Sequence, residues 1–195
     1  MEMLTLWNKR KKMKFIPENI YHVYNQGNNK QDVFIEDFQF SYFLQLYKQY
    51  IVPHCETLAW CLMNNHFHFM IYADSRCFEL KKQGGLILDP ITNGFRKLLS
   101  TYAHEFNVKN NRTGSLFRPK TKSICLNDEA ELSNMYGSKQ DYYLNTFNYI
   151  HNQALEAGIV TNAALWKWSS YRSYTGLRSN SICNIELAKK ICGLV

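Results

Sequence analysis

The sequence contains no Cys-x-x-Cys pair, although six cysteines are spread along its 195 residues. Structural zinc sites and thioredoxin-like redox motifs use such short spacings, so the pattern argues against both classes. Several of the cysteines stand in apolar runs, where a free thiol behaves as a small buried hydrophobic group. The cysteines therefore predict a reducing compartment, the cytoplasm.

Long apolar runs, internal repeats and low-complexity tracts are also missing. No stretch approaches the roughly 18–20 apolar residues that span a bilayer, and the basic N-terminal residues are not followed by the apolar segment of a signal peptide. We therefore expect no membrane association. The length favours a basic arm over residues 1–14, a single domain over 15–178, and a C-terminal extension over 179–195 that contains a short helix.

Positive charge is concentrated in two places. The chain has a formal net charge of +7 and a sequence pI near 9.0. One cluster lies within residues 9–14, and a second includes Arg118, Lys120 and Lys122. Basic side chains mixed with aromatic ones are typical of single-stranded nucleic-acid binding, so these three are candidate DNA contacts. A solvated surface would explain the same clusters, and the sequence leaves both interpretations open.

The periodicity of apolar residues predicts an α+β fold. Strands are expected over residues 21–25, 57–63, 66–71 and 121–126, and helices over 36–51, from Pro90 through Phe106, briefly from Asp128, and over 141–157. The order β-α-β-β-α-β is that of the ferredoxin-like split βαβ arrangement, followed here by a further helix. This arrangement is an antiparallel four-stranded sheet with two helices on one face, and we expect the opposite face to be open for a site.

The third expected strand carries two histidines, His66 and His68, on either side of Phe67. Successive side chains of a strand point to opposite faces, so the two imidazoles share one face, about 6–7 Å apart along the strand. Neutral imidazole is the commonest protein ligand for metal ions. The spacing alone fits a metal site and also fits two hydrogen-bonded histidines at a sheet edge.

The helix expected over 141–157 has two stripes. One is apolar and faces the core; the other is polar and contains Tyr149 and Gln153, which are adjacent because they are four residues apart. An ordinary tyrosine at the rim of the domain would fit the same pattern. His151 points about 200° around the helix from Tyr149, so we interpret it as structural or substrate-facing.

Four short segments carry a resemblance to a known family. They are Leu-Met-Asn-Asn-His-Phe-His at 62–68, Gly-Ser-Leu-Phe at 114–117, Tyr-Ile-His-Asn-Gln at 149–153 and Trp-Ser-Ser-Tyr at 168–171. In this order and spacing they resemble the single-tyrosine HUH transposases, most of all the REP-associated tyrosine transposases. The resemblance runs from about Tyr21 to Tyr174. The His-x-His signature alone is weak, but the combination is specific.

The resemblance implies a ferredoxin-like fold and an enzyme that cleaves and rejoins single-stranded DNA through a 5′-phosphotyrosine intermediate. It implies that Tyr149 is the nucleophile and that His66, His68 and Gln153 bind a divalent metal ion, Mg²⁺ or Mn²⁺. It also implies that the partner is single-stranded DNA with hairpin structure.

The sequence departs from the family pattern in two places. Asn64 stands where a proline is usual in the turn, and Ala154 stands where the REP-associated branch usually has a proline. A glutamine four residues after the tyrosine is typical of the smaller insertion-sequence transposases, which act as dimers with the tyrosine helix in trans, whereas REP-associated relatives act as monomers. A monomer and a homodimer thus both stay open. So do a DNA-binding protein without turnover and a metal hydrolase that needs no tyrosine.

Overall fold

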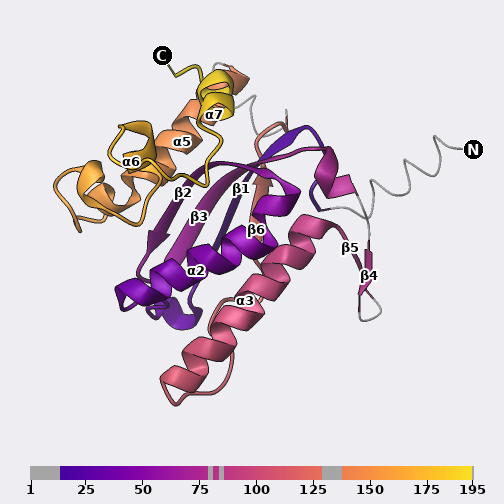
Figure 1. Cartoon of the computed structure of the whole chain (residues 1–195), viewed down its shortest axis with the longest axis vertical. Helices are drawn as coiled ribbons and strands as arrows, with labels where there is room; N and C mark the ends of the chain where they lie inside the picture. Colours follow the sequence, from indigo (N-terminus) through magenta and orange to yellow (C-terminus); the bar gives the residue numbers. More distant parts are fainter. Residues whose placement is uncertain (1–13, 79–80, 84–85, 129–137, 195) are drawn as a thin grey trace, which may run out of the picture.

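The computed structural model describes residues 14–78, 81–83, 86–128 and 138–194. Its main sheet has four strands in the order β2-β3-β1-β6, with antiparallel neighbours throughout (Figure 1). The strands are β1 (Asn19–Gln26), β2 (Glu56–Met63), β3 (His66–Ala73) and β6 (Lys122–Cys125), and the helices are α2 (Asp37–Tyr50), α3 (Pro90–Lys109), α5 (Lys139–Glu156), α6 (Tyr171–Tyr174) and α7 (Ile185–Cys192). The predicted α+β fold with an antiparallel four-stranded sheet is confirmed.

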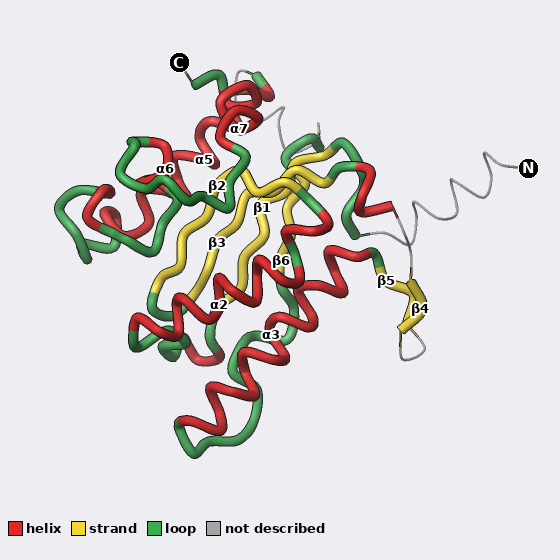
Figure 2. Tube along the Cα trace, in the orientation of Figure 1, coloured by secondary structure: helices red, strands yellow, loops and turns green. Residues whose placement is uncertain are grey.

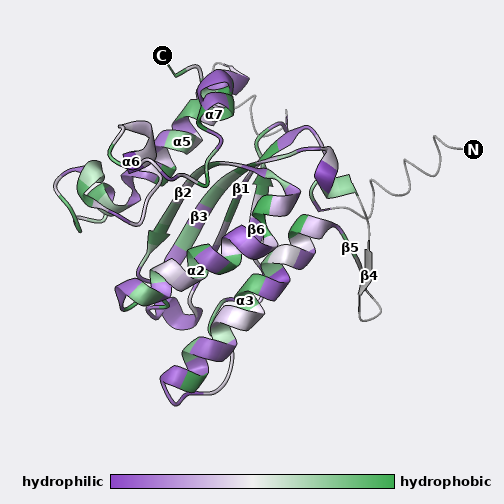
Figure 3. Cartoon of the chain, viewed as in Figure 1, coloured by the Kyte–Doolittle hydropathy of each residue, from purple (hydrophilic) through white to green (hydrophobic). Residues whose placement is uncertain are grey.

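One face of the sheet is covered by α2 and α3, and this side holds most of the core. Phe67, Phe69 and Ile71 of β3 are fully buried there, and the Tyr47 ring of α2 stacks on Phe69 with ring centroids 4.0 Å apart. Figure 3 shows largely hydrophobic strands behind helices whose outer sides are hydrophilic. Because side chains alternate along β3, its phenylalanines point into this core and its histidines point to the other face.

The opposite face is half covered, which corrects the expectation that it stays open. The apolar stripe of α5, with Phe147, Ile150 and Ala154, packs on β2 and β3 together with α7. A helix stripe this apolar must be buried, and β2 offers it an apolar surface because nearly all of its residues are buried. The part of this face over β1 and β6 is left for polar groups.

The segment after α5 closes the edge of β2. The Leu62 amide donates to the Trp168 carbonyl at 2.8 Å, and the Ser170 amide donates to the Trp60 carbonyl at 2.9 Å. The Trp168 ring stacks on Phe40 of α2 with centroids 4.7 Å apart. An edge strand presents unpaired backbone groups, and this segment pairs those of β2. Its tryptophan therefore anchors the segment to the domain.

His151 has a structural position beneath this segment. It is buried, with Nε2 2.7 Å from the Ser170 hydroxyl oxygen, and that oxygen also accepts the Trp60 amide at 2.8 Å. Burial lowers the pKa of His151 to about 3, so the ring is neutral in the folded protein at ordinary pH. The structural interpretation of His151 agrees with this geometry.

Most predicted elements are present with shifted ends. Helix α5 begins at Lys139 rather than 141, because the Ser138 side chain caps it by accepting the Asp141 amide. Two short strands that the sequence did not predict, β4 (Lys81–Gln83) and β5 (Leu86–Leu88), pair antiparallel in a small sheet apart from the main one (Figure 2). Strands this short show no readable alternation. The brief helix expected after Asp128 and the basic arm up to residue 13 fall outside the described residues, and the division of the chain at residues 14 and 178 stays a prediction.

Within the described ranges, no helix is both long enough and apolar enough to cross a bilayer.

The buried neutral His151 makes stability depend on pH. Its folded pKa lies below the unfolded value of about 6.5, so the unfolded chain binds the extra proton and stability falls as the pH drops below about 6.5. We expect His151→Gln to reduce the slope of unfolding free energy against pH by about 1.4 kcal/mol per pH unit between pH 6 and 5, measured by urea unfolding. His104→Gln, at an exposed position on α3, is the matched control. Equal slopes in wild type and His151→Gln would contradict this account.

Candidate active site

Strand β3 begins with the two histidines directly after a two-residue turn. Residues outside the hairpin hold this turn, because the amides of Val33 and Phe34 donate hydrogen bonds to the Asn64 carbonyl at 2.7 and 2.8 Å. The imidazoles of His66 and His68 lie on the α5 face of the sheet with ring centroids 5.0 Å apart and planes nearly perpendicular. The predicted pair is thus placed on one face, and His68 is buried while His66 is half-buried.

Helix α5 brings its polar stripe to this pair within the same chain. The Tyr149 ring stands edge-on to His68 with centroids 5.5 Å apart, and the Gln153 side-chain oxygen lies 3.2 Å from His66 Nε2. The other stripe of the helix is buried against β2, so the rotation of α5 about its axis is fixed. In this position Tyr149 remains 44% exposed.

The hydrogen bonds around His66 leave two acceptor atoms facing each other. The amide nitrogen of Asn65 donates to the Lys30 carbonyl at 3.2 Å, and that of Gln153 donates to the Tyr149 carbonyl at 3.3 Å. Both side-chain oxygens therefore point to the imidazole of His66, the Asn65 oxygen to Nδ1 and the Gln153 oxygen to Nε2. A neutral imidazole carries one N–H only. We assign that proton to Nδ1, because the contact to Asn65 is the shorter of the two at 2.5 Å.

His66 Nε2 and the Gln153 oxygen then present lone pairs to one another. Protonating the ring a second time would relieve this contact, but burial lowers the pKa of His66, only partly offset by Gln153. A cation between the two atoms relieves it without that cost. Two neighbouring ligands of an octahedral Mg²⁺ ion, at about 2.1 Å each, stand about 3 Å apart, close to the 3.2 Å seen here. The donor set therefore fits a divalent metal ion.

The candidate ligands His66, His68 and Gln153 are not all of the usual metal-binding types His, Cys, Asp and Glu. In the described part of the chain, no three His, Cys, Asp or Glu side chains are grouped so that they could hold a metal ion. The third candidate ligand is the amide oxygen of Gln153, which is a neutral donor. Imidazole nitrogen suits transition-metal ions and amide oxygen suits Mg²⁺ and Mn²⁺, so a mixed set of this kind suits Mn²⁺ more naturally than Mg²⁺.

The structure adds two site residues that sequence analysis left out, His22 and Tyr24 of β1. His22 Nε2 lies 2.8 Å from His68 Nδ1, and Tyr24 pairs with His68 across the two strands. Burial lowers the pKa of His22 to about 4 and that of His68 well below its ordinary value, the latter also because His22 and His66 are close. All three imidazoles are thus neutral, the form that binds metal. Their alternation on β1 was the only available signal.

An open hollow of about 370 Å³ lies beside His68 and Tyr149. The residues that line it come from β1, β3, β6 and α5: His22, Tyr24, His68, Ile124, Tyr142, Asn145, Thr146 and Tyr149. The hollow leaves open space beside the Tyr149 ring.

The three candidate DNA contacts separate onto different surfaces. Lys122 opens β6 and pairs with Tyr24, so its side chain belongs to the face that carries the hollow. Arg118 and Lys120 precede β6 and line a cleft on the α3 side. All three are exposed.

The chain matches no protein-family model and no curated protein sequence. It is similar in structure to a solved chain described as a REP-associated tyrosine transposase bound to a REP hairpin. The two superpose with a TM-score of 0.55 and 11% sequence identity over 88% of this chain and 91% of that chain. At this identity the similarity shows a shared fold.

The opposed lone pairs of His66 and Gln153 lead to a prediction about metal affinity. We expect Gln153→Leu to weaken Mn²⁺ binding at least tenfold, by analogy with the loss of metal-site groups, measured by isothermal titration at pH 7.5. Asn148→Leu removes an amide from an exposed position of the same helix and should leave the affinity unchanged. Equal affinities of wild type and Gln153→Leu would remove Gln153 from the site.

Proposed function

We propose that this protein is a metal-dependent strand transferase of the single-tyrosine HUH class, which cleaves and rejoins single-stranded DNA that carries hairpin structure. The observation that carries the proposal is the meeting of Tyr149 with His68, and of Gln153 with His66, in one chain. The fold shared with a REP-associated tyrosine transposase supports it. In this proposal Tyr149 is the nucleophile and His66, His68 and Gln153 hold the metal ion.

The chemistry balances without any nucleotide cofactor. The Tyr149 oxygen forms a bond to phosphorus while the bond from phosphorus to the 3′-oxygen breaks, and the phenolic proton is transferred, through solvent, to the departing oxygen. The products are a 5′-phosphotyrosine and a free 3′-hydroxyl. One phosphodiester replaces another, so a second DNA 3′-hydroxyl can reverse the step and join strands. When bound, a divalent ion supplies Lewis acidity at the phosphate.

The chain's own residues position these groups. Burial of the apolar stripe of α5 holds the Tyr149 ring against His68, so that the nucleophile needs little reorganisation before attack. In this proposal Lys122 and Tyr24, which pair across β6 and β1 on the face of the hollow, contact the DNA backbone. The histidine pair of β3 and the Tyr149–Gln153 stripe of α5 come together within one chain, so the proposed enzyme can act as a monomer.

His22 acts in this proposal as a positioning residue for His68. If His68 binds metal through Nε2, its proton sits on Nδ1 and is donated to His22 Nε2, 2.8 Å away. Histidine ligands commonly donate their second ring N–H to a neighbouring acceptor, which fixes both the tautomer and the ring orientation. His22 supplies that acceptor from the adjacent strand.

A covalent-adduct assay tests the function. The protein is incubated with Mn²⁺ or Mg²⁺ and with labelled single-stranded oligonucleotides that carry short hairpins. We expect a labelled protein–DNA adduct on a denaturing gel, lost in Tyr149→Phe because no nucleophile remains and lost in His66→Ala because a metal ligand is missing. Tyr142→Phe, another tyrosine that lines the hollow, should still form the adduct.

The other outcomes identify the alternatives. Cleavage that survives Tyr149→Phe would mean hydrolysis by an activated water, and the proposed nucleophile would be wrong. Binding of hairpin DNA without cleavage under any metal would mean a binding protein without turnover. Neither outcome would alter the fold.

The role of His22 predicts a slower but still competent enzyme. We expect His22→Ala to reduce the rate of adduct formation about 10–100-fold, the usual cost of losing a partner of a metal ligand. Long-range ¹H–¹⁵N spectra should show the His68 proton on Nδ1 in the wild type and a mixture of tautomers in the variant. An unchanged tautomer in His22→Ala would contradict this role, whatever happens to the rate.

A further inference from the structure

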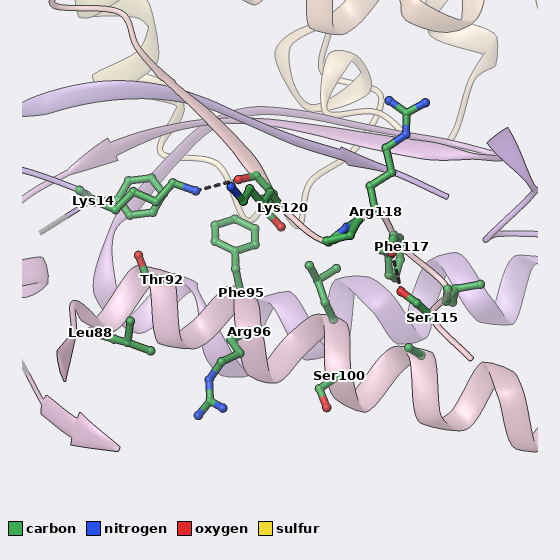
Figure 4. Close-up of a pocket in the computed structure, with 16 residues that line it drawn as sticks. Lys14, Leu88, Thr92, Phe95, Arg96, Ser100, Ser115, Phe117, Arg118 and Lys120 are labelled. Atoms are coloured by element: carbon green, nitrogen blue, oxygen red, sulfur yellow. Dashed lines mark hydrogen bonds between the residues drawn. The ribbon is translucent and has the colours of Figure 1, made fainter. Parts of the chain in front are cut away.

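A second cavity lies away from the histidine cluster, on the α3 side of the sheet. It has a volume of about 550 Å³, well within the range of ligand-binding clefts. One wall is α3, and the other is the extended segment 115–121 that leads into β6 (Figure 4). The proposed reaction does not use this cleft.

The cleft runs along α3. On α3 it is lined by a single stripe that runs from Thr92 through Phe95 and Leu99 to Ala103. At 1.5 Å per residue this stripe is about 16 Å long. The facing segment is tied to the end of β1, because Phe117 bridges to Gly27 and the Arg118 amide donates to the Gln26 carbonyl at 2.9 Å. A groove of this shape suits a chain-like ligand better than a compact one.

The walls of the cleft are apolar, and the charged residues that line it are all positive. The lining includes Phe15, Leu88, Phe95, Leu99, Leu116 and Phe117. Its charged members are all basic, Lys14, Arg96, Arg118 and Lys120, and no Asp or Glu is among the lining residues. An apolar floor with basic groups around it matches the chemistry of a single nucleic-acid strand, whose bases are apolar on their faces and whose phosphates are anionic.

The basic side chains are spread along the groove. Lys14 and Lys120 lie near its Thr92 end, and Arg118 stands nearer Ser115 (Figure 4). The Lys14 ammonium donates to the Thr121 carbonyl at 2.7 Å, which ties residue 14 to the wall. The Arg96 and Arg118 side chains extend away from the cleft on opposite sides (Figure 4). The basic groups are thus distributed along and beside the cleft rather than gathered at one point, which suits several phosphates rather than one.

The groove and the candidate active site share the β6 edge of the sheet. Lys120 lines the groove, while Lys122, two residues later, lies on the face of the hollow. Strand β6 is the last in the sheet. A flexible strand can pass around this edge from one face to the other without crossing the core.

We infer that this groove binds a segment of single-stranded DNA that flanks the segment held at Tyr149. The choice of DNA rests on the proposed function; the groove's preference for a single strand rests on its own apolar floor and basic rim.

Binding measurements test the inference separately from catalysis. The full chain is titrated into fluorescent oligonucleotides of about 5 to about 25 nucleotides, a range that covers single-strand site sizes. We expect Ser100→Trp, which fills the groove from an exposed position, to weaken binding of the longer oligonucleotides at least fivefold and to leave the shortest unaffected. Lys120→Ala should reduce the salt dependence of the longer ones by about 0.7 in the log–log slope, the value for one phosphate contact.

Lys97→Ala is the matched control, because Lys97 is exposed on α3 but does not line the groove; it should leave the slope unchanged. Replacing the flanking nucleotides by abasic ones should weaken binding as much as Ser100→Trp does, since the floor would lose its bases.

Each outcome decides one of the two claims. An adduct at Tyr149 together with wild-type binding by Ser100→Trp and Lys120→Ala would overturn the groove and leave the proposed function standing. Binding that depends on the groove, without any adduct, would overturn the proposed function and leave the groove standing. Competition by polyglutamate of equal charge as strong as that by DNA would also overturn the inference, because the groove would then select acidic peptides.

Discussion

The alternation of β3 is the constraint on which the rest of this structure depends. Phe67 and Phe69 are fully buried against α2 and α3, and this burial fixes which way the strand faces. A shift of one residue would move the aromatic side chains out of the core and the imidazoles into it. Fully burying a phenylalanine side chain contributes about 1.5–3 kcal/mol, so the register of the histidines is set by the hydrophobic effect on the opposite face.

The same burial determines the charge state of the histidines. His68 lies between β1 and β2 in the middle of the sheet, and α5 covers that face beside it. Desolvation lowers the pKa of His68, and His22 and His66 lower it further. A buried group that cannot easily accept a proton keeps a lone pair available for a cation. Burial by the fold thus keeps the lone pairs of these imidazoles available.

Sequence patterns could predict what depends on local periodicity. The alternation of β3 and the two stripes of α5 each follow from residues close together in the chain, and the α+β fold follows from their order. His22 could not be assigned, because its contact with His68 depends on the pairing of β1 with β3, and a five-residue strand with mixed polarity does not fix its register. The α3 groove could not be predicted either, because its walls come from residue 14, α3 and segment 115–121, which are far apart in the sequence. The roles of Tyr149, His66, His68 and Gln153 stay predictions that the geometry supports.

The edge strand β6 unites these observations. An edge strand exposes backbone groups that invite unwanted pairing, and proteins often protect such edges with charge. Here Lys120 and Lys122 place charge at the start of that edge, one on the groove and one on the face of the hollow. The same lysines that discourage another strand from pairing there would attract a phosphate backbone. Edge protection and DNA contact would require the same residues in the same place, and the role of Lys120 and Lys122 in DNA binding stays a prediction.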